Sequence, residues 1–151
     1  MTESVELRTT QLLLRPFKAE DVDDLLAYTN DLEWARYLVN IPPVPYSRED
    51  AEALVAMFTD PANGVTLQIF AVVLGGKVIG DIYLNQRERD RQNERAELGY
   101  SLSRQHWGKG LMTEAAEAVM GWAFQEYSIA RMYATCDLEM CVRAGSWRNW
   151  A

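Results

Sequence analysis

The sequence is poor in the residues that build disulfides and metal sites. Its 151 residues include two cysteines, Cys136 and Cys141, and one histidine, His106. Two thiols fit neither a disulfide framework nor a zinc pattern, because a structural zinc site uses four nitrogen or sulfur ligands. We therefore expect a metal-free protein with reduced thiols, which is typical of the cytoplasm.

Positive charge is also scarce. The formal net charge is -7, from 15 Lys and Arg against 22 Asp and Glu. A nucleic-acid-binding protein needs a basic face that neutralises phosphates, and the arginine-rich stretch at 87–91 alternates in sign, so its field largely cancels. We therefore expect no nucleic-acid partner. A negative surface suits a cationic substrate such as an amine, and it suits plain solubility equally well.

Long apolar runs are missing as well. No run is long enough to cross a bilayer, and residues 1–6 lack the basic and apolar parts of a signal peptide. We therefore expect no membrane partner. The 48% of apolar residues still suffices for a core, and the 25% of charged residues suffices for a soluble surface. Without an internal repeat or a low-complexity linker, a single domain over 1–151 is the simplest prediction.

Hydrophobic periodicity predicts two helices after an N-terminal strand. The strand covers 7–15 and is followed by helical spacing over 22–29. The proline-rich segment 41–45 must be a loop, because proline cannot continue a helix. A second helix begins at Ser47, where an acidic residue three positions later completes a capping box.

The second half of the chain predicts a hairpin, a further strand, a buried helix and a short strand. Two adjacent glycines in the middle of 67–84 are typical of a tight hairpin turn. A polar loop leads to a strand over 95–102, the longest helix begins near Gly110, and a short strand covers 131–136. The order β-α-α-β-β-β-α-β describes an α+β domain with a mainly antiparallel sheet.

The most informative segment is 105–110, Gln-His-Trp-Gly-Lys-Gly, between a strand and the buried helix. Glycines permit a tight turn and a close approach of the backbone to a ligand. The unbonded N–H groups at the helix start then point outward, with the positive end of the helix dipole behind them. This arrangement suits a pyrophosphate, and Arg104 and Lys109 add local positive charge.

Two common phosphate motifs do not match. A Walker loop needs Ser or Thr after its lysine, whereas Gly110 follows Lys109. A Rossmann fingerprint needs a third glycine where Thr113 stands, and it normally occurs in the first βα unit. A phosphate-loop hydrolase is therefore disfavoured.

The remaining pattern, Gln-x-x-Gly-x-Gly, resembles the coenzyme A pyrophosphate loop of the GCN5-related N-acetyltransferases (GNAT). Further segments resemble the ribosomal-protein N-acetyltransferase-like branch of this family. They read LRTTQLLLRPFKAEDVDDLLAYTND, VIGDIYL, AELGYSLSRQHWGKGLMTEAAEAVMGWAF and RMYATCDLE. The resemblance extends to about Glu139 and implies the GNAT fold, a mixed and mainly antiparallel central sheet flanked by helices.

The resemblance implies that acetyl-CoA is the cosubstrate and that a primary amine attacks it directly in a ternary complex. In this family the strand before the loop lends backbone groups to the pantetheine arm, which carries over to Tyr100, Ser101 and Leu102. An N–H here, that of Leu102, would polarise the thioester carbonyl. The pyrophosphate would be held by the loop and the helix entrance: Gln105, His106, Trp107, Gly108, Lys109, Gly110, Leu111, Met112 and Thr113.

The reaction also needs a base, because an amine is largely protonated at neutral pH and must lose a proton before it attacks. Glu97 is the candidate, since the family often places its base on this strand. The alternative is that Glu97 only forms an ion pair with Arg95 or Arg104.

Several neighbouring residues invite a catalytic interpretation that we do not favour. His106 lies inside the pyrophosphate loop, so we expect it to contact the loop or the phosphate. Trp107 is expected to pack the loop against the sheet. Tyr83 and Asn85 either line the amine cleft or are ordinary strand residues, and we favour the second interpretation.

The chain departs from the family pattern after Glu139. The family continues with an Asn, a short helix and two more strands, whereas here Met140 stands where Asn is expected and 146–148 resembles a remnant of the helix. We expect the C-terminal strands to be missing or replaced. Dimerisation or strand exchange would then cover the sheet edge and the side chains of Trp147 and Trp150.

This departure leaves two functional hypotheses. The first is an active N-acetyltransferase whose acceptor is a protein N-terminus or a small-molecule amine. The second is a catalytically weak or inactive acetyl-CoA-binding module that serves as a sensor or interaction protein. No residue is assigned to protonate the leaving thiolate.

Overall fold

The computed structural model of the protein describes residues 4–36, 44–63 and 67–134. Within these residues one six-stranded sheet has the order β1-β2-β3-β4-β5-β6. All neighbouring strands are antiparallel except β5 and β6, which are parallel. The predicted mixed, mainly antiparallel sheet is thus confirmed. The strands are β1 (Leu7–Arg8), β2 (Leu13–Arg15), β3 (Leu67–Leu74), β4 (Lys77–Asn85), β5 (Arg95–Leu102) and β6 (Arg131–Tyr133).

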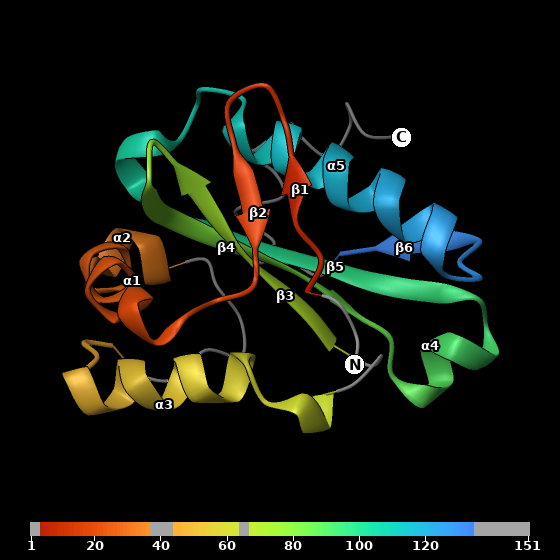
Figure 1. The fold of residues 1–151 in the computed structure, drawn as a ribbon, viewed down its shortest axis with the longest axis horizontal. Coiled ribbons are helices and arrows are strands. Elements are labelled where there is room, and N and C mark those ends of the chain that lie inside the picture. Colours follow the sequence, from red (N-terminus) through yellow and green to blue (C-terminus); the bar gives the residue numbers. More distant parts are fainter. Residues whose placement is uncertain (1–3, 37–43, 64–66, 135–151) are drawn as a thin grey trace.

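Helices cover both faces of this sheet (Figure 1). Neighbouring residues of β3 point to opposite faces: Phe70 and Val72 pack in the core under α5, whereas Ala71 and Val73 pack in the core under α1 and α3. The helices are η1 (Ala19–Asp21), α1 (Val22–Thr29), α2 (Leu32–Ala35), α3 (Arg48–Phe58), η2 (Pro61–Asn63), α4 (Glu88–Gln92), η3 (Arg104–His106) and α5 (Leu111–Glu126).

The prediction of one N-terminal strand over 7–15 is wrong, because the chain turns back on itself within this segment. Strands β1 and β2 pair antiparallel, with Leu7 opposite Leu14. Thr9 closes the turn: its N–H donates to the Leu12 carbonyl at 2.9 Å, and its hydroxyl oxygen accepts from the Leu12 N–H at 2.9 Å. A threonine side chain that bonds to the nearby backbone competes with strand pairing in this way.

The predicted second helix and central hairpin are confirmed. The Ser47 hydroxyl accepts from the Asp50 N–H at 3.1 Å, and the Asp50 carboxylate accepts from the Ser47 N–H at 2.9 Å, which completes the capping box of α3. Gly75 and Gly76 form the turn between β3 and β4 with φ of 57° and 81°. Further along β4, a Cβ on Gly80 would lie 2.3 Å from a carbonyl oxygen of β5, so this position requires glycine for the two strands to pair.

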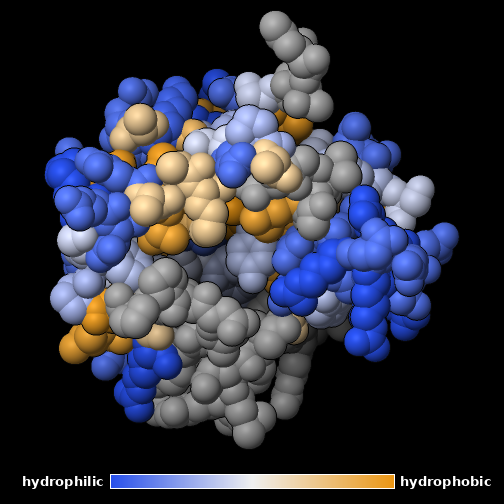
Figure 2. All heavy atoms as spheres, turned by 90° about the horizontal axis from the view of Figure 1, so that it is seen from below, coloured by the Kyte–Doolittle hydropathy of each residue, from blue (hydrophilic) through white to orange (hydrophobic). Residues whose placement is uncertain are grey.

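The predicted polar loop between β4 and β5 contains the short helix α4. Positive and negative side chains alternate here along the sequence, and this pattern indicated a solvated loop. Asp90 is nevertheless only 2% exposed, and the Arg87 N–H donates to its carboxylate at 3.3 Å. Hydrophilic side chains gather at the right of Figure 2, on the side of the molecule where α4 lies.

Parts of the prediction lie outside the described residues. These are most of the 41–45 loop, the strand beyond Ala134, both cysteines and the atypical segment 140–151 with its helix remnant and two tryptophans. No helix in the described part of the chain is long and apolar enough to cross a membrane.

Candidate functional site

The loop between β5 and α5 has the backbone conformation that its glycines predict. Gly108 and Gly110 have φ of 74° and 75°, in the left-handed region that glycine adopts without a steric penalty. A Cβ at either position would meet nothing within 4 Å. The glycines are therefore required for the turn, and they leave open space in front of the backbone.

The N–H groups from Gly108 to Thr113 have no hydrogen-bond acceptor in the described part of the chain. The first bond of the helix runs from the Glu114 N–H to the Gly110 carbonyl at 3.1 Å, and no side chain caps the N-terminus of α5. Six successive donors at the positive end of a sixteen-residue helix suit an anion with several oxygens. Leu111, Met112 and Thr113 contribute the helical half of this row.

The other loop residues are arranged around the turn. Gln105 and Lys109 are exposed. The Trp107 indole N–H donates to the Leu102 carbonyl at 2.7 Å, which ties the loop to the end of β5. Burial and the positive charges of Lys109 and Lys77 lower the pKa of His106. The lowered pKa favours the neutral imidazole of His106, and its buried Nδ1 has no hydrogen-bond partner among the described residues.

The backbone of β5 presents alternate residues to its two neighbours. The Ser103 N–H donates to the Ile79 carbonyl at 2.7 Å, and Leu102 lies opposite Gly80. Because antiparallel bonding alternates, Ser101 bonds to β4, whereas Tyr100 and Leu102 turn their backbone groups toward the other edge. In the described residues β6 pairs with β5 only as far as Glu97. The N–H of Leu102 therefore faces the edge that lies beyond the end of β6.

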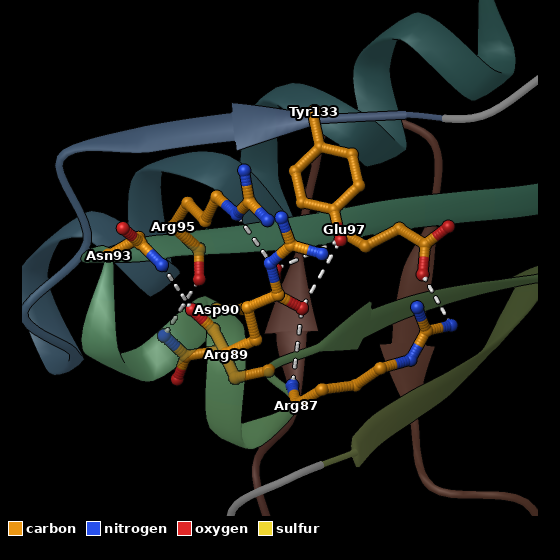
Figure 3. Close-up of polar contacts among 8 residues, drawn as sticks. Arg87, Arg89, Asp90, Asn93, Arg95, Glu97 and Tyr133 are labelled. Atoms are coloured by element: carbon orange, nitrogen blue, oxygen red, sulfur yellow. Dashed lines mark hydrogen bonds and ion pairs between the residues drawn. The ribbon is translucent and has the colours of Figure 1, made fainter.

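Glu97 carries a nearly buried carboxylate on the face of β5 opposite α5. Its side chain is 10% exposed and pairs at 3.2 Å with the Arg87 guanidinium, which is 63% exposed (Figure 3). The two alternative partners named from the sequence are wrong, because Arg95 pairs with Asp90 and Arg104 pairs with Asp31.

Asp90 organises the surroundings of Arg87, which the sequence did not reveal. Its carboxylate accepts from Arg95 Nε at 2.9 Å and from the Tyr133 hydroxyl at 3.1 Å, in addition to the Arg87 N–H (Figure 3). The Arg95 guanidinium also lies over the Tyr133 ring, 5.3 Å from its centroid. Burial would raise the pKa of Asp90, but the bonds from Arg95, Tyr133 and the backbone outweigh it and lower the pKa. The network joins α4, β5 and β6 beside Glu97.

A second polar cluster, also missed from the sequence, lies one strand away. The Tyr28 hydroxyl of α1 and the Ser101 hydroxyl of β5 donate to Oδ2 of Asp81 at 2.8 and 2.6 Å. Burial raises the pKa of Asp81, although both hydrogen bonds oppose this shift. The only local signal was strand alternation, which places Asp81 and Tyr83 on one face of β4.

The ring of Tyr83, a residue of β4, lies over Gly99 of the neighbouring strand β5. A Cβ on Gly99, its partner across the strands, would be 2.1 Å from Cζ of the Tyr83 ring. Burial and the charges of Glu97 and Asp81 raise the pKa of the Tyr83 phenol. The Tyr83 side chain therefore lies between the two carboxylates. Asn85 lies opposite Glu97.

Comparisons with known proteins agree on one family. The profile described as "Acetyltransferase (GNAT) domain" matches residues 11–139. The protein named "Uncharacterized N-acetyltransferase p20" of Bacillus licheniformis is 33% identical over 135 residues, which cover 88% of this chain and 74% of the relative. YnaD of Bacillus subtilis, also named an uncharacterized N-acetyltransferase, is 28% identical over a segment that covers 89% of this chain and 75% of the relative.

Solved structures give the same picture at the level of the fold. An acetyltransferase of the GNAT family from Bacillus anthracis superimposes with a TM-score of 0.75 at 25% identity, over 95% of this chain and 79% of that one. The ribosomal L7/L12 alpha-N-protein acetyltransferase RimL in complex with coenzyme A gives a TM-score of 0.80 at 20% identity, over 96% and 82%.

Proposed function

Because the chain belongs to the GNAT acetyltransferase family, we propose that it acetylates a primary amine that attacks acetyl-CoA directly, with Glu97 as the base. The protein is an acetyl-CoA-dependent acetyltransferase by this membership. The identity of the acceptor and the roles of individual residues belong to the proposal.

The row of N–H groups from Gly108 to Thr113, which have no acceptor among the described residues, carries the proposal. It supplies donors and a helix dipole where the coenzyme's diphosphate would be held. Gln105, His106 and Trp107 would flank the diphosphate, and Lys109 would add positive charge. Acetyl-CoA supplies an activated acyl group when it is bound.

The residues of β5 would act on the reacting groups. The Leu102 N–H, turned away from β4, would donate to the thioester oxygen as negative charge grows there. Tyr100 and Ser101 would flank the pantetheine arm. Glu97 would take the proton that the attacking amine loses, directly or through water. Among the described residues, one exposed arginine pairs with its nearly buried carboxylate, and an arriving ammonium group can displace this arginine.

A protein N-terminus is the acceptor that the branch resemblance favours. RimL is described as a ribosomal L7/L12 alpha-N-protein acetyltransferase, and an acetyl transferase of Salmonella typhimurium is described as modifying the N-terminal serine of L7/L12. Their likeness to this chain concerns the fold alone. Dimerisation and a cytoplasmic location remain predictions from the sequence.

Release of coenzyme A with a panel of amines tests the proposal. We expect Glu97→Gln to lower kcat about a hundredfold, because general-base catalysis contributes on that order, while the acetyl-CoA Kd stays near that of the wild type. Glu117→Gln, at an exposed position of α5, is the matched control and should leave both values unchanged.

Two outcomes would count against the proposed acetyltransferase mechanism. A parallel loss of turnover and acetyl-CoA affinity in Glu97→Gln would contradict the role of Glu97 as base. Binding of acetyl-CoA by the wild type without release for any amine would favour the inactive coenzyme-binding module.

A further inference from the structure

Asp81 differs in its partners from the two buried aspartates, Asp21 and Asp90. Asp21 is paired with Arg15 at 2.8 Å and Asp90 with Arg95 at 2.9 Å. No ion pair in the described residues includes Asp81, which accepts hydrogen bonds from two neutral hydroxyls only. A carboxylate enclosed by protein without a cation is unfavourable for the folded state. The fold therefore keeps at this position a carboxyl group that no cation of the described residues neutralises.

The geometry leaves one oxygen of Asp81 available. Tyr28 and Ser101 both donate to Oδ2, and Oδ1 has no hydrogen bond within the described part of the chain. Asp81 is partly exposed, and among the described residues its Oδ1 is not one of the fully buried side-chain atoms that lack a hydrogen-bond partner. The two hydroxyls thus fix the carboxylate and leave Oδ1 open to a ligand.

Two tyrosines lie beside this carboxylate. Tyr28 bonds to it directly, and Tyr83 lies two positions further along the same face of β4. Together with burial, the charge of Asp81 raises the pKa values of Tyr28, Tyr46 and Tyr83, so all three lie within its field. A carboxylate among phenol rings is the environment that binds ammonium groups, through charge and through cation–π attraction.

The location relates this carboxylate to the acetyl-transfer site. Asp81 lies opposite Ser101, and Glu97 lies four positions from Ser101 along β5 on the same face. At the strand rise this separation is about 13 Å between Cα positions. One ammonium group cannot contact both carboxylates, so the two would hold different groups of one acceptor, with Tyr83 between them.

We propose that Asp81 binds a second positive charge of the acceptor, so that the enzyme prefers amines carrying another ammonium or guanidinium group on the order of 10 Å from the acetylated nitrogen. The inference rests on the proposed function, because it takes Glu97 as the position of the reacting amine. It adds the chemical class of the acceptor, which is dicationic.

The test compares kcat/KM for α,ω-diamines from propane to octane with the monoamine of the same chain length. We expect the wild type to prefer the longer diamines at least tenfold. In Asp81→Asn, which keeps the shape and the hydrogen bonds but removes the charge, the ratio of diamine to monoamine should fall at least tenfold. Asp23→Asn removes the same charge from an exposed position of α1 and should keep the wild-type ratio.

Short peptides distinguish the source of the charge. Two peptides are used that differ at one position, with either Lys or Gln directly after the N-terminal residue. The ratio of their kcat/KM values is compared with the ratio of diamine to monoamine. A larger preference for the lysine peptide assigns the acceptor to polypeptides, a larger preference for a diamine assigns it to small molecules, and either result supports the subsite.

Equal kcat/KM for diamines and monoamines in the wild type, at every length, would overturn the inference even if the variant does not fold. Retention of the diamine preference in Asp81→Asn would overturn it as well. If no amine turns over, the proposed function fails, and calorimetric titration of hexane diamine still tests the subsite: heat that disappears in Asp81→Asn supports it, and absence of heat refutes it.

Discussion

At the scale of single residues, Asp90 shows how a buried charge supports a neighbouring site without reacting itself. It holds Arg95, Tyr133 and the backbone of Arg87, and Arg87 in turn reaches Glu97. Removing the carboxylate would leave these donors without their common acceptor. The effect should therefore appear first in stability.

We expect Asp90→Ala to lower the free energy of unfolding by about 2 kcal/mol, the cost of losing hydrogen bonds to a buried charged group. Urea unfolding measures this. Asp23→Ala breaks the exposed pair with Arg48 and should cost less than about 0.5 kcal/mol, because exposed ion pairs contribute little. Equal losses in both variants would contradict the structural role of Asp90.

The sequence predicted the position of Glu97 but not its partner. Strand alternation is local, so the face of Glu97 followed from its neighbours along β5. The pairing with Arg87 depends on α4, which returns the chain beside β5. Asp81 was missed for the same reason, because its two donors come from α1 and β5.

At the scale of elements, the turn into α5 combines a backbone requirement with a binding surface. The left-handed conformation of Gly108 and Gly110 orients the N–H groups that precede the helix. A β-branched residue at Gly108 strains this conformation even though the space in front of it is open.

We expect Gly108→Val to weaken coenzyme A binding at least tenfold, because the strained backbone turns the donors away and the side chain fills the space of the ligand. Isothermal calorimetry with coenzyme A measures this directly. Gly121→Ala, at an open position within α5, is the control and should bind as the wild type does. Unchanged affinity in Gly108→Val would show that the diphosphate is held elsewhere.

Elements with a strong local signal were predicted well, and those fixed by distant contacts were not. The capping box of α3 and the glycine turn between β3 and β4 are encoded within a few residues. The split of the first strand depends on Thr9, and on Gln11, whose N–H and side-chain amide donate to Glu114 of α5 at 2.9 and 2.8 Å. No local periodicity reports a contact between segments so far apart.

At the scale of the whole molecule, the buried acids link stability to pH. Burial opposes ionisation of Asp21 and Asp90, but hydrogen bonds from Arg15 and Arg95 outweigh it and lower both pKa values. The folded state then binds fewer protons than the unfolded state as the pH falls. Stability contributed by these groups is complete above the unfolded-state pKa of about 4 and is lost as the pH falls through the folded-state values.

We therefore expect Tm to fall as the pH decreases from about 5 to about 2. In the double variant Asp21→Asn/Asp90→Asn, Tm at about pH 5 should be lower than in the wild type. Tm should also fall less as the pH decreases, because the groups that bind protons on unfolding are gone. Asp81 contributes in the opposite direction, since its pKa is raised. A wild-type Tm that is constant over this range would exclude these ion pairs as the source of acid sensitivity.

The row of donors at 108–113 also bears on the catalytic cycle. The diphosphate proposed to bind there is part of both acetyl-CoA and the coenzyme A that remains after transfer, so these donors would stabilise substrate, transition state and product alike. Such binding would raise the affinity for acetyl-CoA without raising kcat, and the product coenzyme A would compete with acetyl-CoA for the same site. Discrimination between the two would have to come from the short stretch of β5 that is proposed to lie beside the acetyl group.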